Sequence, residues 1–385
     1  MNKPKRIKTD PLISLCVLFL MLTGALFVYS ASYYTAEKTY GDKFFFFKKQ
    51  IIGYVIGIAV YVAFSIIDYR KLKKFYIVFY IISAVLLGLV LTPLGKEVYG
   101  AKRWVGIGSF TMQPSELAKF AFVLFTAMFF SSDMSRAKTF KGFLPVVIAG
   151  GLFCLLIIAE PNMSVTVCMG AVMLIMLFIA GVPLKNFVYI LLPVLAAIPV
   201  LIIAEPYRLK RFAAFLDPFS SPKGEGYQLL QSLYALGSGG FFGVGIFNSR
   251  QKLRFLPFAE SDFILSIIGE ETGFFGIIIL LTVCLILSYR IIRAGKNCGN
   301  FFGYLLCVGI ASVFIVQTAV NALVVTGSIP PTGIPFPLVS SGNTQIMAFM
   351  AAFGVVNNIS AQDRKQVVLG ENRLFSAKKR FRKKF

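Results

Sequence analysis

Ten long apolar runs, joined by short polar connections, constrain this chain of 385 residues more than any other feature of its sequence. A membrane-spanning helix needs about 20 mostly apolar residues, because each residue rises about 1.5 Å through a hydrocarbon core of about 30 Å. Composition agrees, since 57% of the residues are hydrophobic and 15% are charged, against roughly 25% in soluble domains. The sequence therefore predicts an all-α integral membrane protein with about ten transmembrane helices. The predicted spans are 11–31, 51–67, 75–92, 115–131, 143–159, 164–182, 187–204, 263–289, 302–325 and 342–359, of which the eighth and tenth are open to a break or tilt.

The positions of lysine and arginine predict the orientation of these spans. With a cytoplasmic amino terminus, 24 of the 39 basic residues fall on the cytoplasmic side, which favours an N-in/C-in topology. The first run is longer than the core of a secretion signal, so we expect it to be retained as a span. The expected organisation is a cytoplasmic tail over 1–10, one membrane domain over 11–359 and a basic cytoplasmic tail over 360–385. A large extracytoplasmic loop over 205–262 lies between helices 7 and 8.

The absence of histidine removes whole classes of mechanism. A histidine base, a histidine-bound zinc and a Ser-His-Asp triad are all excluded. The chain also has no Walker A sequence, no Gly-x-Gly-x-x-Gly fingerprint and no cysteine pair at metal-binding spacing, so we expect neither ATP hydrolysis nor dinucleotide binding. A net charge of +22 on so apolar a chain indicates contact with membrane lipids and not with nucleic acid.

The connection after the third run combines a basic motif with a helix start. Lys102 and Arg103 precede the only tryptophan, and Pro114 suits the first position of a helix. Glu116 and Lys119 are three residues apart, so they can pair on one helix face. The segment is either an interfacial loop anchored by the tryptophan or a site where Lys102 and Arg103 hold an anionic headgroup.

The outer loop and the span after it carry most of the outer polar chemistry. Seven basic residues lie in 205–262, and phosphates are the natural partner of such an excess, although a long loop can also escape the charge rule. Asp262 ends the loop, where it either caps the next helix or serves as a base at the membrane surface. Glu270 and Glu271 lie further in and need a partner, for which Lys119 or an outer-loop arginine is the candidate.

Two other outer connections are unusual. Glu160 begins a tight turn between two apolar runs, where we expect a solvated carboxylate. Residues 321–343 contain four prolines among apolar side chains. They predict a rigid re-entrant segment that lines a cavity, because unpaired backbone cannot face lipid.

Several motifs in a fixed order resemble the FtsW, RodA and SpoVE family of cell-shape, elongation, division and sporulation proteins across nearly the whole chain. The motifs are Gly-Ala-Lys-Arg-Trp at 100–104, Gln-Pro-Ser-Glu-Leu-Ala-Lys at 113–119, Tyr-Arg-Leu-Lys-Arg-Phe at 207–212, Asn-Ser-Arg-Gln-Lys at 248–252, Asp-Phe-Ile at 262–264, Gly-Glu-Glu at 269–271 and Pro-Pro-Thr-Gly-Ile-Pro at 330–335. The resemblance implies a ten-span glycosyltransferase that polymerises lipid II outside the bacterial cytoplasmic membrane. Its implied partners are the nascent glycan strand, a class B penicillin-binding protein and divisome proteins at the septum. The motif at 248–252 looks more like the division branch than the rod-elongation branch.

The resemblance also implies a site. The catalytic aspartate of the family falls on Asp262, which we expect to deprotonate the acceptor 4-hydroxyl while undecaprenyl pyrophosphate departs with inversion. Pyrophosphate leaves without a protonating acid, so one carboxylate suffices, and a divalent cation such as Mg or Mn is an optional aid. The residues expected to bind lipid II, with the basic ones holding its pyrophosphate, are Lys102, Arg103, Arg208, Lys210, Arg211, Gln251, Lys252 and Ser261. Intramembrane polar support is expected from Glu116, Lys119, Glu270 and Glu271.

The chain departs from the family pattern near this site. Phe258 and Ser261 stand where the family usually has glutamate and threonine, Phe247 replaces a customary glycine, and Ser-Gly-Asn-Thr at 341–344 replaces a common Tyr-Gly-Gly-Ser. These departures bear on substrate placement and turnover. The other readings are a lipid II transporter that uses the acids within the spans, a scaffold that only recruits its partner, and an elongation or sporulation paralogue.

Overall fold

The computed structural model describes residues 10–98, 101–107, 110–203, 206–220, 222, 224 and 226–381. Within these residues, nine helical segments are long and apolar enough to cross a membrane. Their helices are α1 (Pro11–Tyr40), α2 (Phe45–Ile66), α3 (Tyr76–Val90), α4 (Pro114–Ser132), α5 (Phe140–Ala159), α6 (Met163–Ala180), α10 (Ile264–Asn297), α11 (Phe301–Val325) and α12 (Asn343–Phe381). Short 3-10 helices cover Tyr69–Lys74, Met134–Lys138, Leu184–Asn186 and Pro218–Ser220. Nine of the ten predicted spans are therefore confirmed as long apolar helices.

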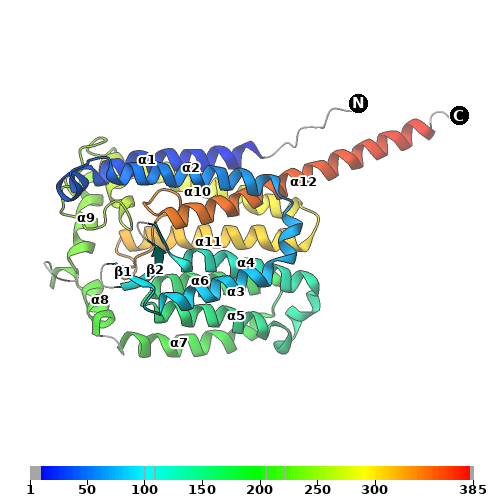
Figure 1. The fold of residues 1–385 in the computed structure, drawn as a ribbon, viewed down its shortest axis with the longest axis horizontal. Coiled ribbons are helices and arrows are strands. Elements are labelled where there is room, and N and C mark those ends of the chain that lie inside the picture. The colour runs from blue at the N-terminus through cyan, green and yellow to red at the C-terminus, as the bar shows by residue number, and fades with distance from the viewer. Residues whose placement is uncertain are drawn as a thin grey trace.

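The predicted seventh span forms a shorter helix, α7 (Phe187–Ile203), of 17 residues. Pro193 and Pro199 lie inside it, where each removes a backbone hydrogen bond of the helix. At about 1.5 Å per residue this helix is a few ångströms shorter than a hydrocarbon core of about 30 Å. It runs along the edge of the bundle, beside α5 in Figure 1.

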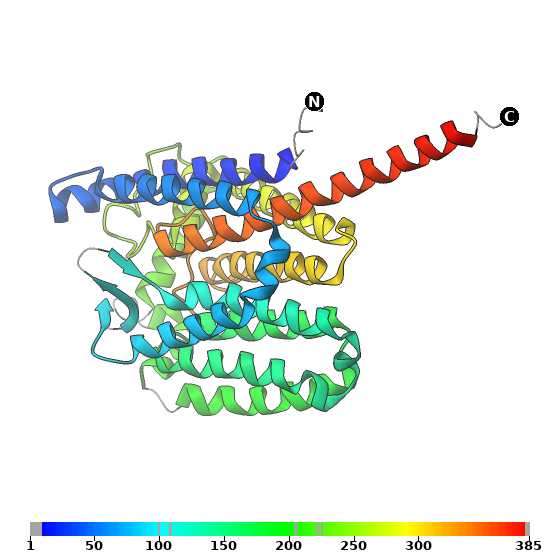
Figure 2. The same cartoon turned by 45° about the vertical axis from the view of Figure 1, so that its right-hand side comes forward.

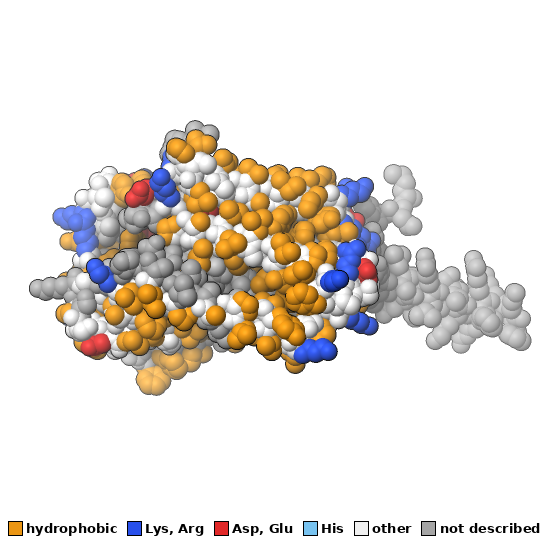
Figure 3. Space-filling view, turned by 90° about the horizontal axis from the view of Figure 1, so that it is seen from below, with side chains coloured by type: hydrophobic (Ala, Val, Ile, Leu, Met, Phe, Trp, Pro, Cys, Tyr) orange, Lys and Arg blue, Asp and Glu red, His pale blue; other side chains and the backbone are white. Residues whose placement is uncertain are grey.

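The helices run side by side, so the molecule has two distinct ends (Figures 1 and 2). The start of α1 and the described end of α12 lie at one end. The opposite end carries α8 (Pro206–Leu216), α9 (Tyr227–Gly239) and a small sheet. Between the ends, hydrophobic side chains cover much of the face seen in Figure 3, while lysine and arginine side chains gather toward the ends. An apolar belt between two charged rims is the pattern of a multi-pass membrane protein.

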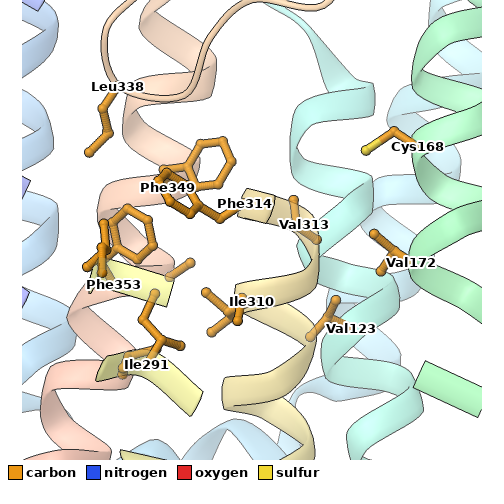
Figure 4. Close-up of a cluster of buried hydrophobic side chains, with 14 of the residues drawn as sticks. Val123, Cys168, Val172, Ile291, Ile310, Val313, Phe314, Leu338, Phe349 and Phe353 are labelled. Carbon is orange, nitrogen blue, oxygen red and sulfur yellow. The ribbon is translucent and has the colours of Figure 1, made fainter. Parts of the chain in front are cut away.

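The core includes a cluster where four helices, α4, α6, α11 and α12, meet. Phe314 of α11 lies 5.5 Å from Phe353 and 5.9 Å from Phe349 of α12, ring centre to ring centre, in edge-to-face contact. Figure 4 shows these rings with Val123 of α4 and Val172 of α6, and all five side chains are buried. This packing fixes α11 at the centre of the molecule, so polar side chains on α11 have defined positions.

The expected break in the eighth span lies at Gly273, inside α10. Its φ of 67° and ψ of −169° are not helical, and a glycine tolerates them without a side-chain clash. The segment 240–245 satisfies the backbone groups that the break frees. Val244 N–H and Gly245 N–H donate to the carbonyls of Glu270 and Glu271, at 2.9 and 3.1 Å. The outer loop is thereby tied to the wall of the bundle by backbone hydrogen bonds.

A three-stranded antiparallel sheet lies at the end that carries α8 and α9, where the sequence suggested a loop. It comprises β1 (Gly95–Val98), β2 (Ala101–Ile107) and β3 (Phe110–Met112), in the order β1-β2-β3. Trp104 pairs with Lys96, and Val105 pairs with both Gly95 and Met112. The sheet projects from the bundle in Figure 2, and β3 leads directly into α4. The loop expectation was wrong here, because the strands are short and their apolar alternation is weak.

Candidate active site

Asp262 lies between a turn and the start of α10. The carboxylate does not cap this helix, because the residue at the N-cap is Phe263 and no side chain caps it. Instead Asp262 Oδ1 accepts a hydrogen bond from Ser261 Oγ at 2.9 Å, and the side chain is half-buried. The capping interpretation is therefore wrong, and the carboxylate is free for another role.

Gly333 marks the point where Asp262 and Arg103 approach each other. A Cβ atom added to Gly333 would lie 3.3 Å from Asp262 Oδ2 and 3.5 Å from Arg103 Nη1. These two side chains come from α10's entry turn and from β2, which are far apart in the sequence. The structure thus brings a carboxylate and a guanidinium to one glycine, with no side chain between them.

The segment that carries Gly333 runs between α11 and α12 without helical structure, and its apolar side chains Ile334 and Phe336 are buried. Asn321 Nδ2 of α11 donates to two carbonyls, that of Asp262 and that of Ile334, each at 2.8 Å. Ser340 Oγ donates to the Ser261 carbonyl at 2.6 Å. Hydrogen bonds thus lock this non-helical, partly buried segment to the backbone carbonyls of Ser261 and Asp262.

A buried polar chain supports this segment from within the bundle. Lys119 Nζ lies 2.9 Å from both carboxylate oxygens of Glu116 and 2.6 Å from Gln317 Oε1. Gln317 Nε2 and Gln345 Nε2 both donate to the Pro335 carbonyl, at 3.1 and 3.0 Å. The predicted Glu116–Lys119 pair is confirmed, and it connects α4 to the Gly333 segment.

The basic residues predicted to bind lipid II do not all lie at the Gly333 segment. Arg211 of α8 reaches the Gly333 segment, where its Nη1 lies 3.5 Å from the Pro331 carbonyl. Lys210 and Lys102 are exposed, and Lys102 pairs with Glu97 in the register of the sheet. The side chain of Arg208 lies outside the described residues. Of the described basic candidates, Arg103 and Arg211 are thus the two placed at the Gly333 segment.

Lys252 has a structural role in place of the predicted substrate contact. Its side chain is buried, and Nζ lies 2.8 Å from Glu271 Oε1 and 3.1 Å from Ser30 Oγ. The rings of Tyr33 and Phe247 cover the ammonium at 5.1 and 5.7 Å. A substrate phosphate cannot reach a buried, fully engaged ammonium without breaking these contacts.

The partners proposed for Glu270 and Glu271 were wrong, since neither Lys119 nor an arginine side chain holds them among the described contacts. Glu271 pairs with Lys252. Glu270 accepts hydrogen bonds from Ser249 Oγ at 2.5 Å and from the backbone N–H of Arg250 at 2.9 Å. The two acids therefore anchor the outer loop to α10. The neighbouring Gln251 also has a buried Oε1 atom with no hydrogen-bond partner in the described part of the chain.

Glu160 is a residue whose position the sequence did not reveal. The side chain is fully buried, so the expectation of a solvated carboxylate was wrong. Neither carboxylate oxygen has a hydrogen-bond partner among the described residues. Arg103 Nη2 donates to the next carbonyl, that of Pro161, at 2.5 Å, which places Glu160 behind the arginine of the site. The only hint in the sequence was the shortness of the turn between two apolar runs.

The carboxyl groups of Asp262 and Glu160 differ in pKa. Burial raises the pKa of Asp262 to about 6, while the hydrogen bond from Ser261 and the charges of Arg103 and Arg211 lower it. Burial raises the pKa of Glu160 to about 8, opposed by the charge of Arg103. At pH 7 Asp262 is therefore mostly a carboxylate and Glu160 mostly a neutral acid, so Asp262 is the better base.

The Asp262 pKa predicts how activity depends on pH. A base must be deprotonated to accept a proton. The rate of the reaction in which Asp262 is the expected base should therefore rise with pH and reach half its maximum near pH 6. At pH 5 the rate should be about tenfold lower than at pH 7, because roughly one carboxyl in ten is then ionised. Initial rates in one detergent across pH 4.5 to 8 would measure the midpoint. A midpoint near pH 4, the ordinary value for aspartate, would contradict the burial of this group.

Gly333→Ala tests how close the site residues lie. The added methyl would sit 3.3 Å from Asp262 Oδ2, so this carboxylate must shift by a few tenths of an ångström, while Arg103 Nη1 at 3.5 Å is in ordinary contact. We expect about a tenfold loss of rate, since small misplacements of reacting groups are costly. Gly88→Ala in α3 is the matched control, because no atom lies within 4 Å of its added methyl. Equal rates for the two variants would show that Gly333 does not border the reacting groups.

Comparison with known proteins places the chain in one family. The family model for FtsW, RodA and SpoVE, described as "Cell cycle protein", matches residues 10–365. A Trichlorobacter lovleyi protein named "Probable peptidoglycan glycosyltransferase FtsW" is 38% identical over 367 residues, which cover 94% of this chain and 96% of that protein. The "Stage V sporulation protein E" of Bacillus subtilis is 36% identical over 364 residues, with 94% and 99% covered.

Solved structures share the fold. One chain in a structure titled "Structural coordination of polymerization and crosslinking by a peptidoglycan synthase complex" aligns with a TM-score of 0.77 at 24% identity, covering 92% of this chain and 98% of that one. The rod shape determining protein RodA of Thermus thermophilus aligns with a TM-score of 0.68 at 22% identity, covering 94% and 99%. With a family model that spans most of its length and close relatives over nearly the same range, this chain belongs to the FtsW, RodA and SpoVE family of cell cycle proteins.

Proposed function

We propose that this membrane protein is a peptidoglycan glycosyltransferase that polymerises lipid II into glycan strands at the outer face of the bacterial cytoplasmic membrane. The observation that carries the proposal is the Asp262 carboxylate, which does not cap α10 and lies, like Arg103, next to Gly333. Relatives that are 33–38% identical bear the name peptidoglycan glycosyltransferase FtsW. The outer face corresponds to the end with the sheet, α8 and α9, given an N-in/C-in topology.

In the proposed reaction, Asp262 removes the proton from the 4-hydroxyl of the acceptor sugar. The acceptor oxygen bonds to the anomeric carbon of the donor with inversion, and the bond from that carbon to the lipid pyrophosphate breaks. The departing pyrophosphate takes the electron pair and needs no acid, which suits a site with one base. Arg103 and Arg211 stabilise its growing negative charge as fixed cations.

Ser261 orients the base in this proposal through its hydrogen bond to Asp262 Oδ1. The exposed Lys102 and Lys210, together with Arg208, contribute a positive field that attracts the anionic lipid. Gln251 lies in the anchored loop, and its Oε1 is buried without a hydrogen-bond partner among the described residues, so a direct contact with lipid II would require the loop to shift. Within the described residues, no three Cys, Asp or Glu side chains gather as a metal site. The positive charge that this mechanism uses comes from the arginines.

The proposed cellular setting is supported by the relatives that are named FtsW. We propose action at the division septum, with a class B penicillin-binding protein that crosslinks the strands and with other divisome proteins. The acids within the bundle do not favour the transporter alternative, because Glu116 and Glu271 are in buried ion pairs and Glu270 accepts hydrogen bonds from the outer loop. They therefore stabilise the structure and are not left to bind a moving substrate.

Incubation of the purified protein with fluorescent lipid II tests the proposal. A ladder of glycan products on a gel is expected, in larger amount when a cognate class B penicillin-binding protein is added. Digestion of the ladder by a muramidase confirms that the bonds are those of peptidoglycan. Absence of a ladder under both conditions, from protein shown to be folded, would contradict the proposal.

A further inference from the structure

A cavity lies beside the turn that leads to Asp262. It has a volume of about 250 Å³ and lies between the outer ends of α1 and α2 and residues 254–260. Glu260, in its lining, is two residues before Asp262, so their Cα atoms are at most about 7 Å apart. A ligand in this cavity therefore lies within a sugar unit or two of the proposed base.

The lining combines aromatic rings with hydrogen-bonding groups. Tyr40, Phe46 and Phe258 are among its lining residues, and Tyr40 stacks on Phe45 with ring centres 3.9 Å apart. Thr35 and Thr39 also belong to the lining. A sugar presents apolar C–H faces and a rim of hydroxyl and amide groups, and a lining of this mixed kind fits such a ligand.

The charges in the cavity argue against a phosphate ligand. The lining contains one guanidinium, Arg254, and one carboxylate, Glu260, so their formal charges cancel. Arg254 Nη2 already donates to Thr39 Oγ1 at 2.9 Å. Near Asp262, by contrast, the positive charges of Arg103 and Arg211 face a single carboxylate. The cavity therefore suits a neutral, hydroxyl-rich group better than a lipid headgroup or pyrophosphate.

We propose that this cavity binds a sugar unit of the growing glycan strand, one step away from the bond being formed. The inference rests on the proposed function and adds to it a strand-binding subsite. The volume lies below the roughly 300–1,000 Å³ of drug-sized ligand pockets, which suits one N-acetylated sugar and not a whole disaccharide-peptide. A polymerase with such a subsite retains the glycan strand between successive additions of lipid II, so we expect it to make long strands.

Product length and direct binding test the subsite. Tyr40→Ala in the full-length protein should shorten the glycan ladder by more than it lowers the initial rate of lipid II consumption. It should also weaken binding of a lipid-free peptidoglycan tetrasaccharide about three- to tenfold in saturation-transfer NMR, the range expected for the loss of one ring contact. Tyr40→Phe keeps the ring and should behave as the wild type. Tyr189→Ala, which removes an exposed tyrosine from α7, is the matched control and should leave ladder length unchanged.

The outcomes separate the two proposals. If the wild type makes a ladder and Tyr40→Ala makes one of the same length with the same tetrasaccharide affinity, the subsite is wrong while the proposed function stands. The subsite is equally wrong if Tyr189→Ala shortens the ladder as much, or if phospholipid vesicles compete with the tetrasaccharide. A folded wild type that makes no glycan at all would overturn the proposed function and the strand assignment with it.

Discussion

Asp262→Asn should lower the rate of lipid II polymerisation at least about 100-fold, since a positioned base contributes about 10²–10⁴-fold. The amide cannot accept the proton of the acceptor hydroxyl. It can still accept the hydrogen bond from Ser261 Oγ, and the backbone contacts of the Asp262 carbonyl are unchanged. We therefore expect a folded protein with a melting temperature close to that of the wild type. Initial rates and melting curves from the same preparation would check both expectations.

Asp133→Asn is the matched control for this substitution. Asp133 is an exposed aspartate beyond α4, and it accepts hydrogen bonds from Ser135 through a single oxygen that an asparagine also provides. The control should retain the wild-type rate. If Asp262→Asn polymerised lipid II as fast as the control, another group would have to be the base.

Lys119→Met should destabilise the protein by about 3–5 kcal/mol, because removal of one partner leaves a buried charge without compensation. Lys119 and Glu116 are each 1% exposed, and Lys119 Nζ contacts both carboxylate oxygens of Glu116 and Gln317 Oε1. The substitution also frees Gln317, whose other end holds the Pro335 carbonyl. Activity should fall as well, because the Gly333 segment loses part of its support. Unfolding in a mild detergent, followed with the rate assay, would measure both effects.

A second substitution and a surface pair sharpen this test. Glu116→Gln together with Lys119→Met removes both charges, so it should recover much of the lost stability. Lys48→Met breaks an ion pair of similar length, 2.7 Å, but this pair is exposed, so its loss should cost much less stability. Equal costs for Lys119→Met and Lys48→Met would contradict a supporting role for the buried pair.

Features of the sequence that are local and repetitive predicted the fold well. A span is a continuous apolar run, and Pro114 marks the start of α4 and precedes the Glu116–Lys119 pair by only a few residues. The folded-in segment around Gly333 was also predictable, because four prolines among apolar residues cannot form a lipid-facing helix. The role of Asp262 came from the motif resemblance. The structure added the decisive detail that its carboxylate does not cap α10.

Features that depend on distant partners were not predictable. Lys252 looks like any other loop lysine until α1 brings Ser30, and α10 brings Glu271, to its ammonium. Glu160 lies in an ordinary turn motif, and its burial depends on the packing of the surrounding helices. The proximity of Arg103 to Gly333 involves residues 230 positions apart, and neither a repeat nor a fixed spacing predicts it. Composition and spacing predict the local structure of a segment, whereas these contacts arise only from tertiary packing.

Proteoliposomes that contain labelled lipid II test the central claim most directly, because one sample reports both glycan formation and lipid movement. The proposed mechanism predicts glycan strands with the wild type and at least about a 100-fold loss with Asp262→Asn. It also predicts that lipid II crosses the bilayer no faster with the protein than without it. Protein-dependent movement of lipid II without glycan formation would contradict the claim that this membrane protein polymerises lipid II with Asp262 as its base.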